Sequence, residues 1–210
     1  MSEVKVNKLS PRSGTTVTIG DSGDTINVVG TLQNNGSSVG ITSKEGGTNF
    51  TNSLLVGTDS TGTLSSAIGN TGVGIGVFGA LTTGDNNVAV GLNALDVMTS
   101  AAQNTAVGAC ALAATTEGGC NTGVGYLSLT ANTTGTENVA VGRCALAANT
   151  TAANNTAVGY FALKANTTAT NNTAVGKASM LSTTTGTCNT AVGMCSMADN
   201  TTGDQNAAFG

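Results

Sequence analysis

Side chains that could carry out catalysis are scarce in this chain of 210 residues. It contains no histidine, which removes the usual general base of serine and cysteine hydrolases and the commonest metal ligand. The segment Gly36-Ser37-Ser38-Val39-Gly40 matches the nucleophile elbow, a turn that presents a reactive serine. Because the serine has no histidine partner and no alternation of strands and helices surrounds it, we interpret this match as chance.

A second match has the spacing of the dinucleotide-binding fingerprint. Residues 74–79 read Gly-Ile-Gly-Val-Phe-Gly, and Asp96 follows Gly76 by twenty residues. That fingerprint functions where a helix begins at the glycines and its N-terminus holds the pyrophosphate. No helical pattern follows here, and Gly74 belongs to the repeat described below. We therefore expect these glycines to be structural.

The carboxylates of the repeat region form neither the facing pair of a glycosidase nor the recurrent pattern of a calcium-binding solenoid. We expect them to keep the surface soluble. They are Asp85, Asp96, Glu117, Glu137, Asp199 and Asp204. The sequence thus predicts no catalytic residue, no cofactor-binding residue and no metal ligand, and a protein that is not an enzyme.

The five cysteines are an odd number and lack CxxC spacing. Without a recognisable signal peptide, we expect reduced, buried thiols that act as small hydrophobes, with disulfides as the alternative. They are Cys110, Cys120, Cys144, Cys188 and Cys195.

Charge excludes a nucleic-acid partner, and hydropathy excludes insertion in a membrane. The formal net charge is −4, and only Arg143, Lys164 and Lys177 are basic within the repeats. No basic stripe exists that could neutralise phosphates, so we expect no nucleic-acid partner. The polar N-terminus lacks the apolar core of a signal peptide, and the longest apolar stretch, 72–81, is too short to cross a bilayer. We expect no membrane insertion.

Composition favours a fold that stacks small side chains in rows. Only 9% of residues are charged and 3% aromatic, with no tryptophan and one proline. This is not the signature of disorder, and it excludes a large aromatic core. The chain instead repeats a 17-residue unit. Its glycines recur at that interval without an insertion: Gly74, Gly91, Gly108, Gly125, Gly142, Gly159, Gly176, Gly193 and Gly210.

Eight complete units span 70–205, and a ninth begins at Asn206. Gly40 and Gly57 keep the same phase, which indicates two weaker units before the regular ones. We divide the chain into an N-terminal segment 1–30, a transition 31–69 with degenerate coils, and the regular repeats 70–210. Because a ninth unit stops at its fifth residue, we expect the natural chain to continue, with receptor specificity in that further part.

Three places in the unit, numbered from its asparagine, never vary. The first is asparagine, the fifth glycine and the thirteenth threonine. The asparagines are Asn70, Asn87, Asn104, Asn121, Asn138, Asn155, Asn172, Asn189 and Asn206. The threonines are Thr82, Thr99, Thr116, Thr133, Thr150, Thr167, Thr184 and Thr201. We expect an amide ladder, a glycine column with positive φ or close backbone approach, and a hydrogen-bonded turn column. Ice binding by the threonine row is the alternative.

The unit reads as a short strand, a glycine corner, a second apolar segment and a threonine-rich return. Common helical repeats are about twice as long and need amphipathic stretches that Asn-Thr-Thr-Gly interrupts. We therefore predict an all-β fold, a β-solenoid or parallel β-roll whose coils stack about 4.8 Å apart.

The residue pattern of the expected strand predicts that the chain associates with copies of itself. Third-place alanine and fourth-place valine are adjacent, so their side chains point to opposite faces. A strand that is apolar on both faces usually lies between two packed layers. We expect one face to fill the coil and the other to pack against sister chains around an axis.

The string Asn-Thr-Ala-Val-Gly-Tyr-Phe-Ala-Leu at 155–163 resembles the head repeat of trimeric autotransporter adhesins. The resemblance implies a trimeric, left-handed parallel β-roll whose Asn-x-Ala-Val-Gly strand faces the trimer axis. The period of 17 exceeds that of the family, so we expect the extra residues to lengthen the threonine-rich turn, and handedness stays open.

Residues 6–26, Val-Asn-Lys-Leu-Ser-Pro-Arg-Ser-Gly-Thr-Thr-Val-Thr-Ile-Gly-Asp-Ser-Gly-Asp-Thr-Ile, are similar to the N-terminal segment of tail-fibre-like proteins of tailed bacteriophages, particularly marine ones. The resemblance implies that the N-terminus joins the phage tail or baseplate and that the repeats form a shaft leading to a receptor-binding tip. It also implies a virion protein made in the host cytoplasm without a signal peptide.

Two alternative functions belong to other proteins built from stacked β-coils. A bacterial surface adhesin head, the alternative binding module, requires export signals that are not seen in this sequence. A left-handed β-helix acyltransferase requires a hexapeptide period and a catalytic histidine, and the sequence has neither. Tyr126, Tyr160 and Phe161 are the side chains best suited to contact a partner, but we expect packing or spacer roles rather than a receptor site.

Overall fold

The computed structural model describes residues 33–34, 37–38, 43–45, 52–57 and 64–210. The chain divides into two units, Met1–Val39 and Gly40–Gly210. Within the first, β1 (Gln33–Asn34) pairs antiparallel with β2 (Ser37–Ser38). The predicted attachment segment 1–30 lies outside the described residues.

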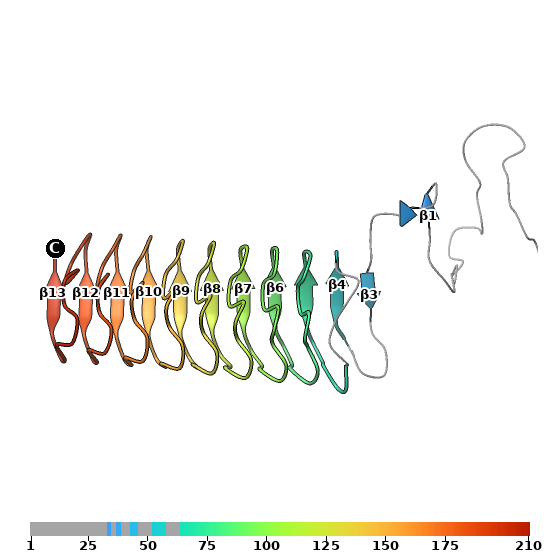
Figure 1. Ribbon diagram of the computed structural model, residues 1–210, viewed down its shortest axis with the longest axis horizontal. Coiled ribbons are helices and arrows are strands. Elements are labelled where there is room, and N and C mark those ends of the chain that lie inside the picture. Colours follow the sequence, from blue (N-terminus) through green and yellow to red (C-terminus); the bar gives the residue numbers. More distant parts are fainter. Residues whose placement is uncertain (1–32, 35–36, 39–42, 46–51, 58–63) are drawn as a thin grey trace, which may run out of the picture. The chain divides into compact units, whose positions relative to one another are not determined.

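The second unit is a β-solenoid, which confirms the predicted all-β fold of 17-residue coils. Its sheet has eleven strands in sequential order from β3 to β13, and the ten from β4 to β13 run parallel (Figure 1). The parts of the chain that the structure describes contain no helix. The strands are β3 (Ser43–Glu45), β4 (Leu54–Val56), β5 (Thr71–Val73), β6 (Val88–Val90), β7 (Thr105–Val107), β8 (Thr122–Val124), β9 (Val139–Val141), β10 (Thr156–Val158), β11 (Thr173–Val175), β12 (Thr190–Val192) and β13 (Ala207–Phe209).

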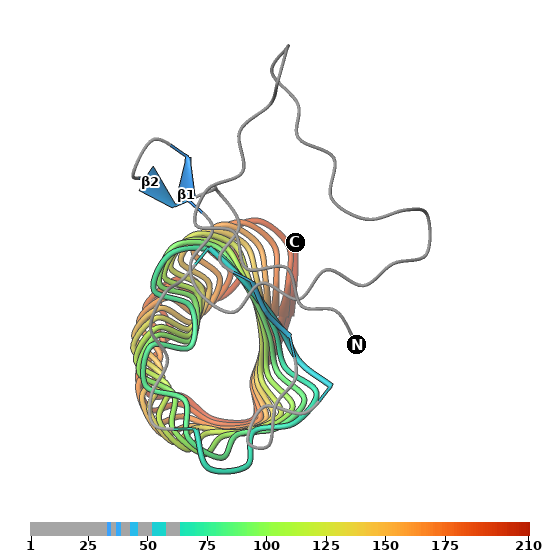
Figure 2. The same cartoon turned by 90° about the vertical axis from the view of Figure 1, so that its right-hand side faces the viewer.

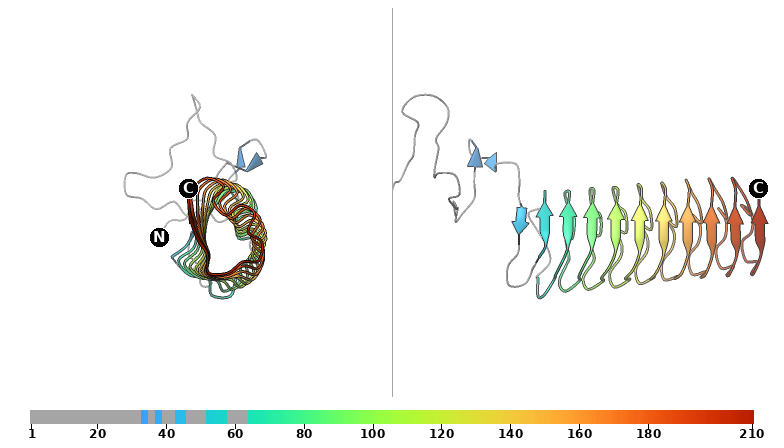
Figure 3. Two further views of the ribbon diagram at one scale, coloured as in Figure 1. Left: turned by 90° about the vertical axis from the view of Figure 1, so that its left-hand side faces the viewer. Right: turned by 180° about the vertical axis from the view of Figure 1, so that it is seen from behind.

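Adjacent strands pair with the same register throughout. Ala157 of β10 lies opposite Ala174 of β11 and Ala140 of β9, so equivalent residues of successive coils stack into columns. Viewed along the stack, the coils superimpose with a closed outline (Figure 2), and the view from behind shows the same unbroken row of strands (Figure 3). We number the coils from Asn70, so that coil 1 is 70–86 and coil 8 is 189–205.

The first strands of the sheet pair differently from the later ones. β4 pairs parallel with β5 seventeen residues later, so the weaker unit that contains Gly57 joins the solenoid. β3 then pairs with β4 in the antiparallel direction. In the phase of Gly40, by contrast, Ser37 and Ser38 form β2 and pair with β1, outside the solenoid sheet. The described part of the transition therefore contributes one parallel coil strand.

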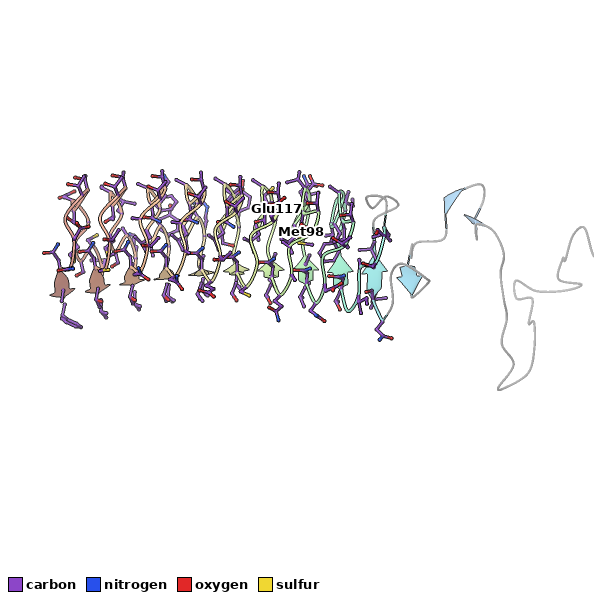
Figure 4. The ribbon with its side chains drawn as sticks, turned by 90° about the horizontal axis from the view of Figure 1, so that it is seen from below. Met98 and Glu117 are labelled. Carbon is purple, nitrogen blue, oxygen red and sulfur yellow. The ribbon has the colours of Figure 1, made fainter. Side chains whose placement is uncertain are left out.

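The interior of each coil is narrow. Third-place residues such as Ala140 and Ala157 are fully buried, and the ninth place supplies the largest apolar side chain, as Leu129 and Leu146 do. The eighth place is small in most coils because it lies beside the third, inside the same layer. Figure 4 shows the contrast between buried Met98, inside its coil, and exposed Glu117, on an outer turn.

Left-handed backbone closes every coil. The seventh, ninth and seventeenth places have φ between +48° and +61° wherever the residue is not glycine, and the coil of β8 shows this at Leu127, Leu129 and Glu137. Such φ values are uncommon outside glycine and asparagine. Backbone hydrogen bonds continue through these corners: Cys144 N–H donates to Tyr126 C=O at 2.9 Å, and Leu146 N–H to Ala162 C=O at 3.0 Å. The stack itself therefore holds these residues in place.

Candidate functional site

The first-place asparagines form a continuous ladder inside the solenoid. Each of them from Asn87 to Asn206 donates its backbone N–H to the side-chain Oδ1 of the asparagine one coil earlier, at 2.9–3.0 Å. In six of these eight steps the side-chain Nδ2 also donates to that oxygen, at 3.0–3.2 Å. Ser53 continues the column below Asn70, whose backbone N–H donates to its Oγ at 2.8 Å.

The ladder is also tied across the coil. Each asparagine from Asn70 to Asn189 donates Nδ2 to the carbonyl of the residue fourteen positions later, at 2.7–3.0 Å. That residue occupies the fifteenth place and is always glycine or alanine. A buried amide whose donors and acceptor are all satisfied stabilises the coil, whereas an unpaired one destabilises it.

The fifth-place glycine is required at the corner where the strand ends. Gly125 has φ +132°, and a Cβ there would lie 2.7 Å from the carbonyl carbon and oxygen of Gly142. Glycines at this place from Gly74 to Gly193 share these two features. The backbones of successive coils therefore approach too closely at this column for any side chain.

The thirteenth-place threonine hydroxyls donate to the next coil, whereas the groups of the asparagine ladder donate to the preceding coil. Each hydroxyl from Thr82 to Thr184 donates to the backbone carbonyl of the threonine one coil later, at 2.9–3.4 Å. The backbone N–H of the same threonine donates to that carbonyl as well, as Thr133 does to Thr150 at 2.8 Å. The hydroxyls are thus engaged within the stack, as a turn column requires.

A second amide column, not predicted from the sequence, lies at the twelfth place. Asn149 Nδ2 donates to Asn132 Oδ1, and Asn166 Nδ2 to Asn149 Oδ1, both at 2.9 Å. All three side chains are buried, and each also donates to the fifteenth-place carbonyl of its own coil. The recurrence of Asn or Thr at this place in coils 3 to 8, beside an invariant small fifteenth residue, is the signal that could have revealed it.

This second column is interrupted at both ends. Asn166 Oδ1 and Thr115 Oγ1 are buried without a hydrogen-bond partner. The next residue after Asn166 in the column, Thr183, instead donates its hydroxyl to Asn200 C=O at 2.8 Å. A threonine side chain has no amide to extend toward Asn166. The unpaired oxygen of Asn166 therefore belongs to the last amide of this run, because the next residue in the column is a threonine.

The outer face of the sheet carries the second and fourth places. Among the fourth-place valines, Val73, Val141 and Val192 are exposed and the others are half-buried, with Val73 the most exposed at 41%. The second place is threonine or valine, and Val88 and Val139 are exposed there. Together these two columns form a strip, the valine face, that runs the length of the solenoid.

The sixth-place side chains lie just beyond the valine face. Within coils 4 to 7 they are Tyr126, Arg143, Tyr160 and Lys177, and all four are exposed. Arg143 Nη1 donates to Tyr160 Oη at 3.2 Å. Tyr126, Arg143 and Tyr160 form, with seventh-place Phe161 and tenth-place Lys164, the one cluster of contacting aromatic and cationic side chains in the described repeats.

Two carboxylates have a specific structural contact. Asp85 and Asp204 both occupy the sixteenth place, and their Oδ1 atoms accept the backbone N–H of Ile68 at 2.7 Å and of Thr187 at 2.6 Å, one coil earlier. No described group of three or more Cys, Asp or Glu side chains could hold a metal ion.

The expectation that the thiols are buried was wrong for most of them. All five are free, but only Cys144 is buried, Cys110 is half-buried, and Cys120, Cys188 and Cys195 are exposed. The reason is positional: they occupy the seventh and seventeenth places, which are outer corners. The searched residues also include no helix with the length and apolarity needed to cross a membrane.

No protein-family model, no curated protein and no solved structure matches the chain. The arrangement of its residues is therefore what bears on function: two buried amide ladders, a glycine column and a threonine column that join coil to coil.

Proposed function

We propose that this chain is a structural fibre protein of a phage virion, either a tail fibre or a fibre attached to the baseplate. Residues 1–30 anchor it to the tail, and the coils form a shaft. The observation that carries the proposal is the stack itself, in which coils of one fixed length are bonded to each other by side chains as well as backbone. Such a stack sets a length and resists bending, which is what a shaft has to do.

The N-terminal similarity to tail-fibre-like proteins directs the proposal toward a virion. The alternative, the head of a bacterial surface adhesin, uses the same kind of coil. Its resemblance concerns the repeats alone, whereas the virion proposal accounts for residues 6–26 as well.

The shaft is a homotrimer in this proposal. The valine face supports it, because a column of valines that are exposed or half-buried along the whole stack is an apolar surface available for an interaction. Three copies that bring their fourth-place valines to a common axis would bury the strip in every coil. The shaft presents a host-receptor-binding region at its far end, and it has neither a nucleic-acid partner nor a segment inserted in a membrane.

Immunogold labelling tests the virion assignment. Antibodies raised against residues 1–30 are applied to purified virions and to the bacterial host. Gold at the tail or baseplate is the expected result. Unlabelled virions, with gold on the bacterial surface instead, would contradict the proposal and favour the adhesin.

A further inference from the structure

The sixth-place column of coils 4 to 7 alternates between aromatic and cationic side chains. It reads Tyr126, Arg143, Tyr160 and Lys177 from one coil to the next. Parallel strands stack about 4.8 Å apart, so the two tyrosine rings lie on coils about 9.6 Å apart with a cation between them. We propose that this Tyr–Arg column binds an acidic polysaccharide that lies along the solenoid axis.

The side chains of the column are already arranged to receive a ligand. The Arg143 guanidinium carbon lies 5.8 Å from the Tyr126 ring centroid and 5.6 Å from that of Tyr160. The hydrogen bond to Tyr160 Oη fixes the guanidinium between the two rings. It engages one of the five N–H donors of an arginine, so the others remain for an anionic oxygen. Tyr126 is 49% exposed and Tyr160 37%, which leaves ring surface for contact.

A second pair of side chains widens the site on one flank. Phe161 stacks on Tyr160 with a centroid distance of 3.9 Å, and Lys164 Nζ lies 4.4 Å above the Phe161 ring. A cation held over an aromatic ring in this way keeps its charge near the surface, because the ring is not an anion and cannot neutralise it.

Charge at the site is unbalanced. The three cations of the repeats all belong to coils 5 to 7, and none of them forms an ion pair with a carboxylate among the described residues. The carboxylate nearest in sequence, Glu137, occupies the seventeenth place, before the strand, whereas the column lies after it. A ligand that complements this surface is anionic.

A polymer of acidic sugars fits both features of the column. Sugar rings have apolar C–H faces that stack on exposed aromatic rings, and their carboxylate or sulfate groups bind arginine and lysine. The column is one side chain wide and several coils long, which suits an extended chain. A single nucleic-acid strand could also stack its bases on the rings, so it is an outcome that the test distinguishes.

Binding of defined polymers to the full chain tests the proposal. The probes are polygalacturonate for a carboxylated sugar, dextran sulfate for a sulfated one, dextran as the neutral control, and polyaspartate and single-stranded DNA as other polyanions. We expect saturable binding of polygalacturonate or dextran sulfate, and which of the two binds identifies the acidic group. Arg143→Gln and Tyr160→Ala are each expected to weaken it by about tenfold or more. The control Leu92→Ala removes an exposed sixth-place side chain outside the column and should leave affinity unchanged.

Four results would overturn the proposal: no binding of either acidic polysaccharide, equal binding of dextran, equal binding of polyaspartate or DNA, or unchanged affinity in the two column variants. Because all substituted side chains are at the surface, circular dichroism should show the same fold in each variant. The outcome is independent of the virion assignment, since the site could serve a fibre or an adhesin.

Discussion

Asn138 illustrates what a single residue does in this solenoid. Its Nδ2 donates to Asn121 Oδ1 at 3.1 Å and to Ala152 C=O at 2.8 Å, and its Oδ1 accepts the backbone N–H and Nδ2 of Asn155 at 3.0 and 3.2 Å. The side chain is fully buried, so no water can replace these partners. One amide therefore joins three coils.

Substitution of Asn138 by alanine removes all four hydrogen bonds and leaves buried polar groups without partners. Each unpaired group costs about 1–3 kcal/mol. We expect Asn138→Ala to lower the free energy of unfolding by at least about 3 kcal/mol, measured by denaturant titration followed by circular dichroism. Thr151→Ala, at an exposed turn position, is the control and should change stability by less than about 0.5 kcal/mol. Equal effects of the two substitutions would contradict the ladder's role.

The interruption of the second column predicts a stabilising substitution. In Thr183→Asn, Nδ2 can donate to the orphaned Asn166 Oδ1 of the preceding coil and to Gly186 C=O of its own coil, as Asn149 and Asn166 do at the equivalent places. These two bonds replace the single bond of the Thr183 hydroxyl to Asn200 C=O. We expect a gain of about 1 kcal/mol in unfolding free energy. Thr185→Asn places the same side chain on the surface of the same coil and should have little effect. Destabilisation by Thr183→Asn would show that the orphaned oxygen is not the determining feature.

At the scale of the elements, strand β8 (Thr122–Val124) and the corner that follows it contain two glycines with different structural roles. Gly123 occupies the third place, where most coils have alanine, and a Cβ there meets the Ser128 hydroxyl at 3.1 Å. Gly125 occupies the fifth place, where a Cβ meets the next coil's backbone at 2.7 Å with φ at +132°. A side chain can move aside, whereas the backbone of a packed coil cannot.

We therefore expect Gly123→Ala to change stability by less than about 1 kcal/mol, in either direction. Gly125→Ala should lower the unfolding free energy by at least about 2 kcal/mol, because it combines an unfavourable φ with a steric clash. Thermal unfolding of the two variants measures the difference. A fold that tolerates Gly125→Ala as well as it tolerates Gly123→Ala would refute the close approach of the coils.

The strand and its glycine corner were predictable from sequence because invariant residues mark them. The other corners were not. Leu129 and Cys144 have left-handed backbone although neither residue type favours it, so the conformation comes from closing the coil and from bonds to neighbouring coils. The corners also expose Cys188 and Cys195, which the absence of a recognisable signal peptide and of CxxC spacing had led us to expect buried. The twelfth-place amide column was not predictable as an invariant place, because Leu81 and Met98 occupy it in the first coils and it does not recur throughout the repeat.

For the whole molecule, the constant coil length predicts how the chain tolerates deletion. Removing residues 104–120, one complete coil, joins Gln103 to Asn121 and keeps every column in register. We expect the variant to fold with the same circular dichroism spectrum and to be shorter by about 4.8 Å, the spacing of one coil. Small-angle scattering gives the length.

Removing residues 104–112, about half a coil, is the matched control. It would bring interior places of one coil against turn places of the next, so we expect loss of cooperative unfolding and aggregation. Comparable folding of the two deletions would contradict the view that coil length is fixed by the ladders.

The central claim is that the chain is a shaft built from three copies that share the valine face. Sedimentation equilibrium of the full chain under native conditions tests it most directly. The account predicts one species with the mass of three chains of 20.4 kDa, and its dissociation in a Val141→Glu variant, which places a charge on that face. A stable species with the mass of one chain, soluble with its valines exposed, would contradict it.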